Sequence, residues 1–364
     1  MSFLYDEGHH AIATESRRIL DARMDKDRLL KLLEQIGRYD EPFWQTATEQ
    51  GWTALAIPQE HGGLGLGLIE LGLVAQAAGA HTAGAAFLTV GYGAARGLLD
   101  GTDERLKTNW LPQLASGEKI ATVAFADASA PLPQASSVRF ENGALSGTKS
   151  AVVAGLRADV ALVWARHGEQ PALCLAELSH VSRNPLNSFD NSRLYADLVF
   201  DSTPATLVAE GEAARRIALE TLAAMAVVTG HEQLGGAEEL LIMARDYALT
   251  RKAFGQPIGA FQSVKHRIAE LYGLVELARA NCIHAAASDR QKHFLMAAAD
   301  VRISATEAYD TAARDCTQIH GGIGVTWEQG IHLHMRRARS LAIEQGNLLF
   351  WEDLLVEQMT GVAA

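Results

Sequence analysis

Apolar residues in the first third of the chain recur at close to 3.6-residue spacing. Leu29, Leu33 and Ile36 follow this period, which places their side chains on one face of a helix. The pattern predicts a helical N-terminal domain over residues 1–118. Within it, residues 52–58 are predicted as a short extended piece between helices, because a Gly-rich turn follows them.

The hydrophobic period changes at Lys119. From there to residue 210, short runs of β-branched and aromatic residues alternate with turn residues, as in the strands of a sheet. Asn142-Gly143 lies between two of these runs, and this dipeptide favours a two-residue hairpin turn. The pattern predicts a middle antiparallel β domain over residues 119–210.

The last segment, residues 211–364, is rich in alanine and returns to the helical period, which predicts a C-terminal helical bundle. Its glycines are predicted to separate long helices, at Gly235-Gly236, at residues 255–259 and at residues 321–324. The complete chain is therefore predicted to have an α+β fold with helical, β and helical domains in that order.

Composition narrows the possible functions. The 364 residues include 32 Lys plus Arg and 43 Asp plus Glu, a formal net charge of −11. This balance argues against nucleic-acid binding, which needs a basic surface. Cys174, Cys282 and Cys316 are widely spaced, so neither a disulfide framework nor a thiolate zinc site is supported, and a reducing, cytoplasmic location is predicted. No stretch has the length needed to span a bilayer, so no membrane association is predicted.

A corner between two predicted helices carries the most suggestive chemistry. Arg251, Phe254 and Gln262 lie around a Gly-x-Pro break, between a helix that ends near Tyr247 and an apolar stripe that begins at Val264. A guanidinium pairs with phosphate through two hydrogen bonds, and Phe offers a face for stacking. From the residues alone, the segment is equally compatible with a structural corner and with a clamp for a diphosphate and a planar ring.

Two other motifs favour simpler interpretations. The glycines at 321–324 do not follow a strand and lack full GxGxxG spacing, so a nicotinamide-binding Rossmann site is disfavoured. His320, His332 and His334 have no carboxylate or cysteine at ligand spacing, so packing roles are favoured and no metal is predicted.

Four sequence motifs, at residues 51–65, 111–118, 251–262 and 318–324, resemble motifs of one family. On these motifs the chain resembles the acyl-CoA dehydrogenase family over about residues 5 to 355. The resemblance implies FAD as cofactor, an acyl-CoA thioester as substrate and electron-transfer flavoprotein as acceptor. It also implies FAD contacts, to a flavin held mainly by a neighbouring subunit, for a set of matching positions: Arg251, Phe254, Gln262, Gln318, Gly321 and Gly322.

The position of the catalytic base departs from the family pattern. The family reaction removes the proton α to the thioester with a carboxylate, while hydride leaves the β carbon for the flavin. The resemblance places that Glu at Gln345, or in some members at Met225, and neither residue can accept a proton in this way. Glu344 is adjacent to Gln345, but one step along a helix rotates a side chain by about 100°. It is the candidate base if this chain has one.

The β domain departs from the family pattern independently. Family members offer Thr-Glu-Pro, Gly-Ser-Asp and Trp-x-Thr or Trp-x-Ser segments to the flavin ring. The matching places here read Ala126-Asp127-Ala128, with no Gly-Ser-Asp, and Ala151-Val152-Val153. After Gly346, the family's Thr and Gln are replaced by Asn347 and Leu349. Features that hold a subunit's own flavin are missing, whereas those that reach a neighbour's flavin are intact.

This asymmetry resembles heteromeric acyl-CoA dehydrogenases of bacteria that degrade steroid side chains, in which two unlike subunits share an active site. The resemblance implies a heterotetramer with a homologous partner subunit and a bulky or steroid acyl group. Two alternatives stay open. One is a self-sufficient homotetramer that uses Glu344 or another carboxylate as base, and the other is a non-catalytic binding or structural homologue.

Overall fold

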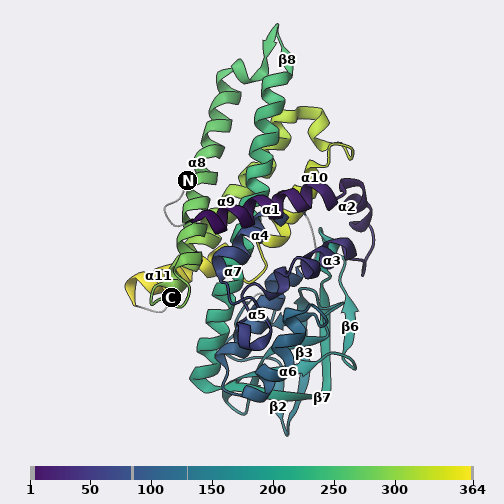
Figure 1. Ribbon diagram of the computed structural model, residues 1–364, viewed down its shortest axis with the longest axis vertical. Helices are drawn as coiled ribbons and strands as arrows, with labels where there is room; N and C mark the ends of the chain where they lie inside the picture. The colour runs from purple at the N-terminus through teal and green to yellow at the C-terminus, as the bar shows by residue number, and fades with distance from the viewer. Residues whose placement is uncertain (1–4, 83–85, 129, 362–364) are drawn as a thin grey trace. The chain divides into compact units, whose positions relative to one another are not determined.

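The computed structural model of the chain describes residues 5–82, 86–128 and 130–361. A helical, a β and a second helical segment follow one another along it (Figure 1), which confirms the predicted fold class. Its contacts group the chain into two compact units. One comprises Met1–Leu30, Gly72–Ala83 and Ala226–Ala364, and the other comprises Lys31–Leu71 and Gly84–Met225. The domain limits at residues 118 and 210 stay a prediction.

The N-terminal segment is helical, as its apolar period predicts. Several of its helices begin at an aspartate that accepts a hydrogen bond from a free backbone N–H, the usual N-cap arrangement. Asp6 accepts from the His9 amide at 2.9 Å, and Asp103 accepts from the Arg105 amide at 2.8 Å. The helices are α1 (Glu7–Arg23), α2 (Lys26–Leu32), α3 (Glu41–Glu49), α4 (Leu68–Ala80), α5 (Phe87–Asp100) and α6 (Glu104–Ala115).

The extended piece predicted at residues 52–58 is wrong. This segment forms one 3₁₀ turn, Trp52–Ala54, and a second follows at Gln59–His61. The Gly-rich residues after it fold back and donate hydrogen bonds to its carbonyls, for example from the Leu66 amide to the Leu55 carbonyl at 2.8 Å. The local sequence alone did not reveal these pairings, which satisfy the backbone without a strand.

The middle segment is a seven-stranded sheet with the order β1-β4-β2-β3-β7-β5, and β6 also pairs with β7. Because β4 pairs with β5 as well, the path from β4 to β5 closes on itself like a small barrel. The strands are β1 (Ala121–Ala124), β2 (Arg139–Glu141), β3 (Ala144–Val152), β4 (Val160–His167), β5 (Gln170–Glu177), β6 (Ser182–Pro185) and β7 (Ala196–Glu210).

Most strand pairs are antiparallel, as predicted. Asn142 and Gly143 have φ angles of 52° and 77° and form the β2–β3 turn, which confirms the hairpin expected from this dipeptide. The β1–β4 pair and a single β2–β4 pairing run parallel, which refines the prediction. A parallel pair needs a long connection, and the chain between β1 and β4 supplies one that contains the hairpin.

The C-terminal segment consists of long helices. A two-strand hairpin, β8 (Lys252–Ala253) and β9 (Gln256–Pro257), joins the first two helices, and a 3₁₀ turn, Gly321–Val325, follows the third. The helices are α7 (Gly211–Thr250), α8 (Gln262–Ala287), α9 (Phe294–His320), α10 (Ile331–Leu341) and α11 (Leu348–Thr360).

The helix break predicted at Gly235-Gly236 is wrong, because α7 runs through it without interruption. A Cβ added at Gly235 would overlap the backbone oxygen of Gln76 in α4, and one added at Gly236 would overlap the ring of Tyr309 in α9. These glycines therefore allow close helix packing. The intrinsic cost of glycine in a helix, about 1 kcal/mol, is outweighed by this packing.

Candidate flavin corner and base position

The segment after α7 presents an aromatic ring to solvent. Phe254 and Gly255 form the two-residue turn of the β8–β9 hairpin with φ angles of 51° and 81°, and Figure 1 shows this hairpin at the tip between α7 and α8. Phe254 is 96% exposed. A left-handed conformation costs a residue with a side chain about 1 to 2 kcal/mol, and backbone strain of this kind concentrates at functional sites. The turn thus holds Phe254 in a position that packing does not require.

The charge beside this ring is not compensated by the protein. Arg251 is exposed, and no acidic side chain pairs with it within the part of the chain that the structure describes. Its amide donates to the Tyr247 carbonyl at 2.8 Å, and its carbonyl accepts from the Ile258 amide at 2.8 Å. The backbone of Arg251 is therefore fixed by the hairpin, while its guanidinium is available to an anion.

The two motifs expected to contact FAD meet in the fold. Tyr247, in the last turn of α7, stacks on His320 at the end of α9, with ring centroids 4.2 Å apart. Gly321 and Gly322 follow at once, both exposed, and a Cβ added to either would meet nothing within 4 Å. This contact joins the Arg251 corner to a glycine pair that a ligand can approach closely.

The remaining members of the set are also exposed. Gln262 is the first residue of α8, and Gln318 lies in the last turn of α9. An exposed guanidinium, an exposed ring, two amides and open glycine backbone suit the diphosphate and planar groups of FAD. The residues present thus fit the cofactor, although their assignment as its ligands stays a prediction.

Gln345 occupies a structured turn. Its backbone is left-handed, with φ 55°, and Gly346 follows with φ 106°. The Gln345 side-chain oxygen accepts a hydrogen bond from the Thr229 hydroxyl of α7 at 2.9 Å, and Thr229 is fully buried. The place where the family resemblance expects a carboxylate is therefore filled by a neutral amide with a partner of its own.

A buried arginine holds this turn. The Arg302 guanidinium of α9 donates to the Gln233 side chain at 2.8 Å and to the carbonyls of Leu341 at 2.8 Å, Glu344 at 3.0 Å and Gly346 at 3.4 Å. Burial lowers the pKa of Arg302 to about 10, against the opposing effect of the Glu344 charge. Arg302 was not predicted as a functional residue, because an arginine in the middle of an Ala-rich helix gives no signal of burial.

The two other positions considered for the base are both buried. Glu344 is only 4% exposed, and its charge interacts with Arg302, so its role as base stays a prediction. Met225 is 3% exposed, and its sulfur packs against Gly93.

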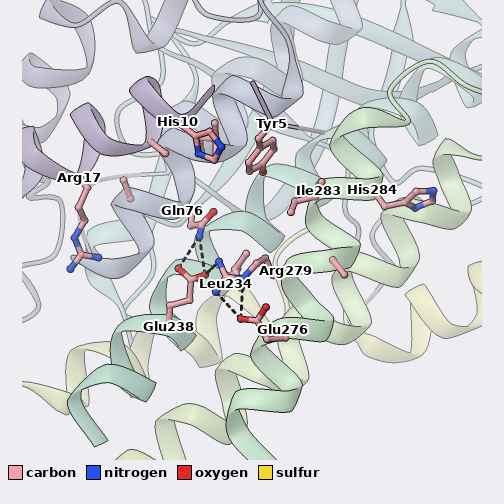
Figure 2. A pocket seen from close by; sticks show the side chains of 14 residues that line it. Tyr5, His10, Arg17, Gln76, Leu234, Glu238, Glu276, Arg279, Ile283 and His284 are labelled. Atoms are coloured by element: carbon pink, nitrogen blue, oxygen red, sulfur yellow. Dashed lines mark hydrogen bonds and ion pairs between the residues drawn. The ribbon is translucent and has the colours of Figure 1, made fainter. Parts of the chain in front are cut away.

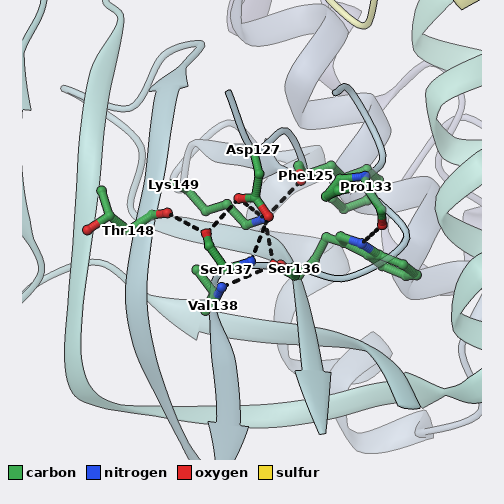
Figure 3. Close-up of polar contacts among 9 residues, drawn as sticks. Phe125, Asp127, Pro133, Ser136, Ser137, Val138, Thr148 and Lys149 are labelled. Carbon is green, nitrogen blue, oxygen red and sulfur yellow. Dashed lines mark hydrogen bonds and ion pairs between the residues drawn. The ribbon is translucent and has the colours of Figure 1, made fainter. Parts of the chain in front are cut away.

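In the β domain, the stretch matching the family's flavin contacts is engaged within the protein. Lys149 is fully buried, and its ammonium donates to Asp127 at 2.8 Å, the Phe125 carbonyl at 2.9 Å and the Ser136 hydroxyl at 2.9 Å. Figure 3 shows these groups converging on the ammonium. Burial lowers the pKa of Lys149 to about 8, although the neighbouring Asp127 acts to raise it.

The same network uses the hydroxyl groups of the segment. Ser137 donates to Asp127 through its amide at 2.8 Å and its hydroxyl at 3.0 Å. Burial acts to raise the pKa of Asp127, but the hydrogen bonds from Lys149 and Ser137 hold this pKa below its ordinary value. At the other matching place, the Val153 carbonyl accepts from the Thr122 hydroxyl at 2.6 Å. These polar groups thus satisfy one another.

The three cysteines and His334 are buried. Cys174, Cys282 and Cys316 are free and buried. His334 is buried against the Tyr309 hydroxyl, 3.0 Å from its Nδ1, and burial lowers its pKa to about 3. Within residues 5–82, 86–128 and 130–361, no three His, Cys, Asp or Glu side chains are placed to hold a metal ion. Among the same residues, no helix has both the length and the apolar character needed to cross a bilayer.

Sequence comparisons decide the family. The profile of the acyl-CoA dehydrogenase N-terminal domain matches residues 6–118, and that of the C-terminal domain matches residues 215–349. The acyl-CoA dehydrogenase IpdE2 of Mycobacterium tuberculosis is 32% identical over 308 residues, 84% of this chain and 82% of the relative. The chain belongs to the acyl-CoA dehydrogenase family. Acyl-CoA dehydrogenases are FAD-dependent oxidoreductases, so the predicted enzyme class and cofactor are confirmed.

Solved acyl-CoA dehydrogenase structures share the fold of this chain. A chain of the ChsE4-ChsE5 complex from Mycobacterium tuberculosis superposes on this chain with a TM-score of 0.89 at 24% identity. The match covers 100% of this chain and 100% of that chain. A variant of the Tcur3481-Tcur3483 steroid acyl-CoA dehydrogenase has a TM-score of 0.87 at 25% identity and covers 98% of each chain. These similarities show that the chain has the acyl-CoA dehydrogenase fold.

Proposed function

We propose that this chain is an acyl-CoA dehydrogenase subunit that completes a FAD site on a homologous partner and supplies no catalytic base of its own. The observation that carries the proposal is the neutral Gln345 at the base position, already hydrogen-bonded to Thr229. The exposed corner with Arg251 and Phe254 supports the other half, because it offers cofactor contacts outward.

Each exposed group has a role toward the partner's cofactor. Arg251 pairs with the diphosphate, Phe254 stacks on a planar ring, and Gln262 and Gln318 donate or accept hydrogen bonds. The open backbone at Gly321-Gly322 lets the chain approach the cofactor without a clash. When bound there, FAD would supply the hydride acceptor for the β carbon of the thioester. This chain's own residues bind and orient, and the partner's residues remove the proton.

The assembly and substrate are proposed by analogy with similar proteins. Two of the similar structures are named as pairs of unlike proteins, and one of these is a steroid enzyme. We therefore propose a heterotetramer with a homologous subunit, a bulky or steroid acyl-CoA thioester and electron-transfer flavoprotein as acceptor. A cytoplasmic location is consistent with three free, buried cysteines.

Purification with and without a homologous partner tests the proposal. The partner should be a paralogue, encoded beside this chain, that has the Glu and the Trp-x-Thr missing here. The pair is expected to copurify with bound flavin and to oxidise an acyl-CoA, whereas this chain alone carries little flavin. Yellow, active protein from this chain alone would instead establish the self-sufficient homotetramer. Absence of turnover with the partner would establish a non-catalytic homologue.

A further inference from the structure

A cavity outside the proposed flavin contacts lies within one compact unit. It has a volume of about 760 Å³, within the range of sites that hold small organic molecules. Its walls come from α1, α4, α7 and α8, together with Tyr5 just before α1, and Figure 2 shows the side chains around it. None of the residues proposed to contact FAD lines this cavity.

Most of the wall is apolar. Leu73 of α4, Leu234 of α7 and Ile283 of α8 line it, together with the small residues Ala77 and Ala280. Leu73 and Leu234 are 4% and 1% exposed, so they belong to the packed interior and keep a fixed shape. An occupant with an apolar body would remove this surface from water.

The charged groups of the wall balance one another. Two arginines, Arg17 and Arg279, line the cavity with two glutamates, Glu238 and Glu276. Arg279 forms ion pairs with both glutamates, and Arg17 pairs with Glu239 at 2.7 Å. An ion that entered this cavity would lose its water without gaining an unpaired partner, which costs much more than the burial of a neutral group. The wall therefore favours an uncharged occupant.

The Tyr5 side chain offers a hydrogen-bond donor to this space. Its ring lies edge-on to His10, with ring centroids 6.1 Å apart. Within the part of the chain that the structure describes, no hydrogen bond of the Tyr5 hydroxyl is found. Burial raises the pKa of this hydroxyl, so it stays protonated and can donate.

The Gln76 side chain offers an acceptor. Its amide nitrogen donates to both Glu238 oxygens, at 2.9 and 2.8 Å, as Figure 2 shows. The oxygen of an amide points away from its nitrogen, and among the described residues the Gln76 side-chain oxygen accepts no hydrogen bond. Buried polar groups rarely stay unpaired. A donor and an acceptor in one apolar cavity suit a hydroxyl group, which accepts and donates at once.

We propose that this cavity binds an uncharged alcohol with a compact apolar body, at a site separate from the proposed FAD contacts. The apolar body lies against Leu73, Leu234 and Ile283. The hydroxyl group of the alcohol accepts a hydrogen bond from Tyr5 and donates one to Gln76. The proposal depends on no part of the proposed subunit role, so either can fail without the other.

Three probes with the same cage and different charge test the proposal. Binding of adamantan-1-ol, 1-aminoadamantane and adamantane-1-carboxylate to the full chain is measured by isothermal titration calorimetry at about pH 8, above the usual pKa of histidine. The alcohol should bind at least about tenfold more tightly than either ion, because each ion would lose its water without compensation. Absence of alcohol binding, or an ion that binds as tightly as the alcohol, would overturn the proposal.

Variants locate the binding. Tyr5→Phe removes only the hydroxyl and should weaken alcohol binding about fivefold, whereas Tyr272→Phe, at an exposed tyrosine of α8 outside this cavity, should not change it. Ala280→Trp should fill the cavity from an exposed position and abolish alcohol binding, whereas Ala269→Trp, exposed on α8 outside this cavity, should not. Unchanged alcohol binding in Tyr5→Phe or in Ala280→Trp contradicts the proposal. A change of oligomeric state in Ala280→Trp also contradicts it, because the cavity would then be a subunit contact.

Discussion

Neutralising Lys149 should change how the stability of the chain depends on pH. This ammonium is fully buried and hydrogen-bonded to Asp127, Phe125 and Ser136, yet burial lowers its pKa from 10.5 to about 8. Between about pH 8 and pH 10.5 the unfolded chain therefore binds more protons at this position than the folded chain does. The free energy of unfolding should rise with pH across this window, since the burial penalty is relieved when the folded lysine loses its proton.

The size of the shift in the Lys149 pKa determines how much the free energy of unfolding changes with pH. A difference of about 2.5 pKa units corresponds to about 3 kcal/mol when the whole window is crossed. Between about pH 7 and pH 9.5, this linkage should increase the free energy of unfolding of the wild-type chain by about 2 kcal/mol. The Lys149→Met variant should lack this increase. The other titrating groups are common to both proteins, so the difference between the two pH profiles isolates Lys149.

Urea unfolding followed by tryptophan fluorescence measures this difference, because Trp164 in the same sheet is fully buried. Lys31→Met, an exposed lysine in the same compact unit, serves as the matched control and should follow the wild-type profile. Lys149→Met should also be less stable at neutral pH, because it leaves Asp127 without its cation. Parallel pH profiles for wild type and Lys149→Met would refute the reasoning about the buried ammonium.

Two further predictions concern packing and the flavin corner. Gly235→Ala should destabilise the chain by several kcal/mol, because the new Cβ would overlap the Gln76 carbonyl. Gly273→Ala, which lies in open space on α8, should stabilise the chain by up to about 1 kcal/mol. Thermal unfolding measures both effects, and equal effects of the two variants would contradict the packing role of Gly235. Arg251→Ala should weaken FAD retention in the assembled enzyme by up to a few kcal/mol, with partial recovery in Arg251→Lys. The flavin content of the purified assembly measures this, and unchanged retention would make Arg251 a structural corner residue.

Local chemistry made part of the structure predictable. Asn142-Gly143 formed the expected turn because its left-handed backbone depends on those two residues alone. The helix–corner–helix arrangement at residues 247–262 was predicted from the Gly-x-Pro break, whereas the β8–β9 hairpin within it was not. The order of helical and β segments followed from the hydrophobic period.

Features that depend on distant partners were not predictable. Gly235 was predicted to break a helix, but the helix continues through it. The glycine is there because a side chain would overlap the Gln76 backbone of α4. From the sequence alone, Lys149 and Arg302 would be predicted to lie at the surface, as most charged residues do. The structure shows that both are buried and donate hydrogen bonds to several acceptors. The family resemblance pointed to Gln345 as the base position, whereas its hydrogen bond with Thr229 became visible only in the structure.

The most direct test of the central claim is the reductive half-reaction of this chain alone. The chain is supplied with an excess of free FAD and mixed anaerobically with a bulky acyl-CoA while the flavin absorbance is followed, in parallel with the assembly that contains the partner. A missing general base typically lowers a rate by about 10² to 10⁴, so the flavin should stay oxidised in this chain and be reduced in the assembly. Gln345→Glu should not restore a normal enzyme, because the β-domain contacts remain absent. Rapid flavin reduction by the chain alone, abolished by Glu344→Gln, would contradict the account and identify Glu344 as the base.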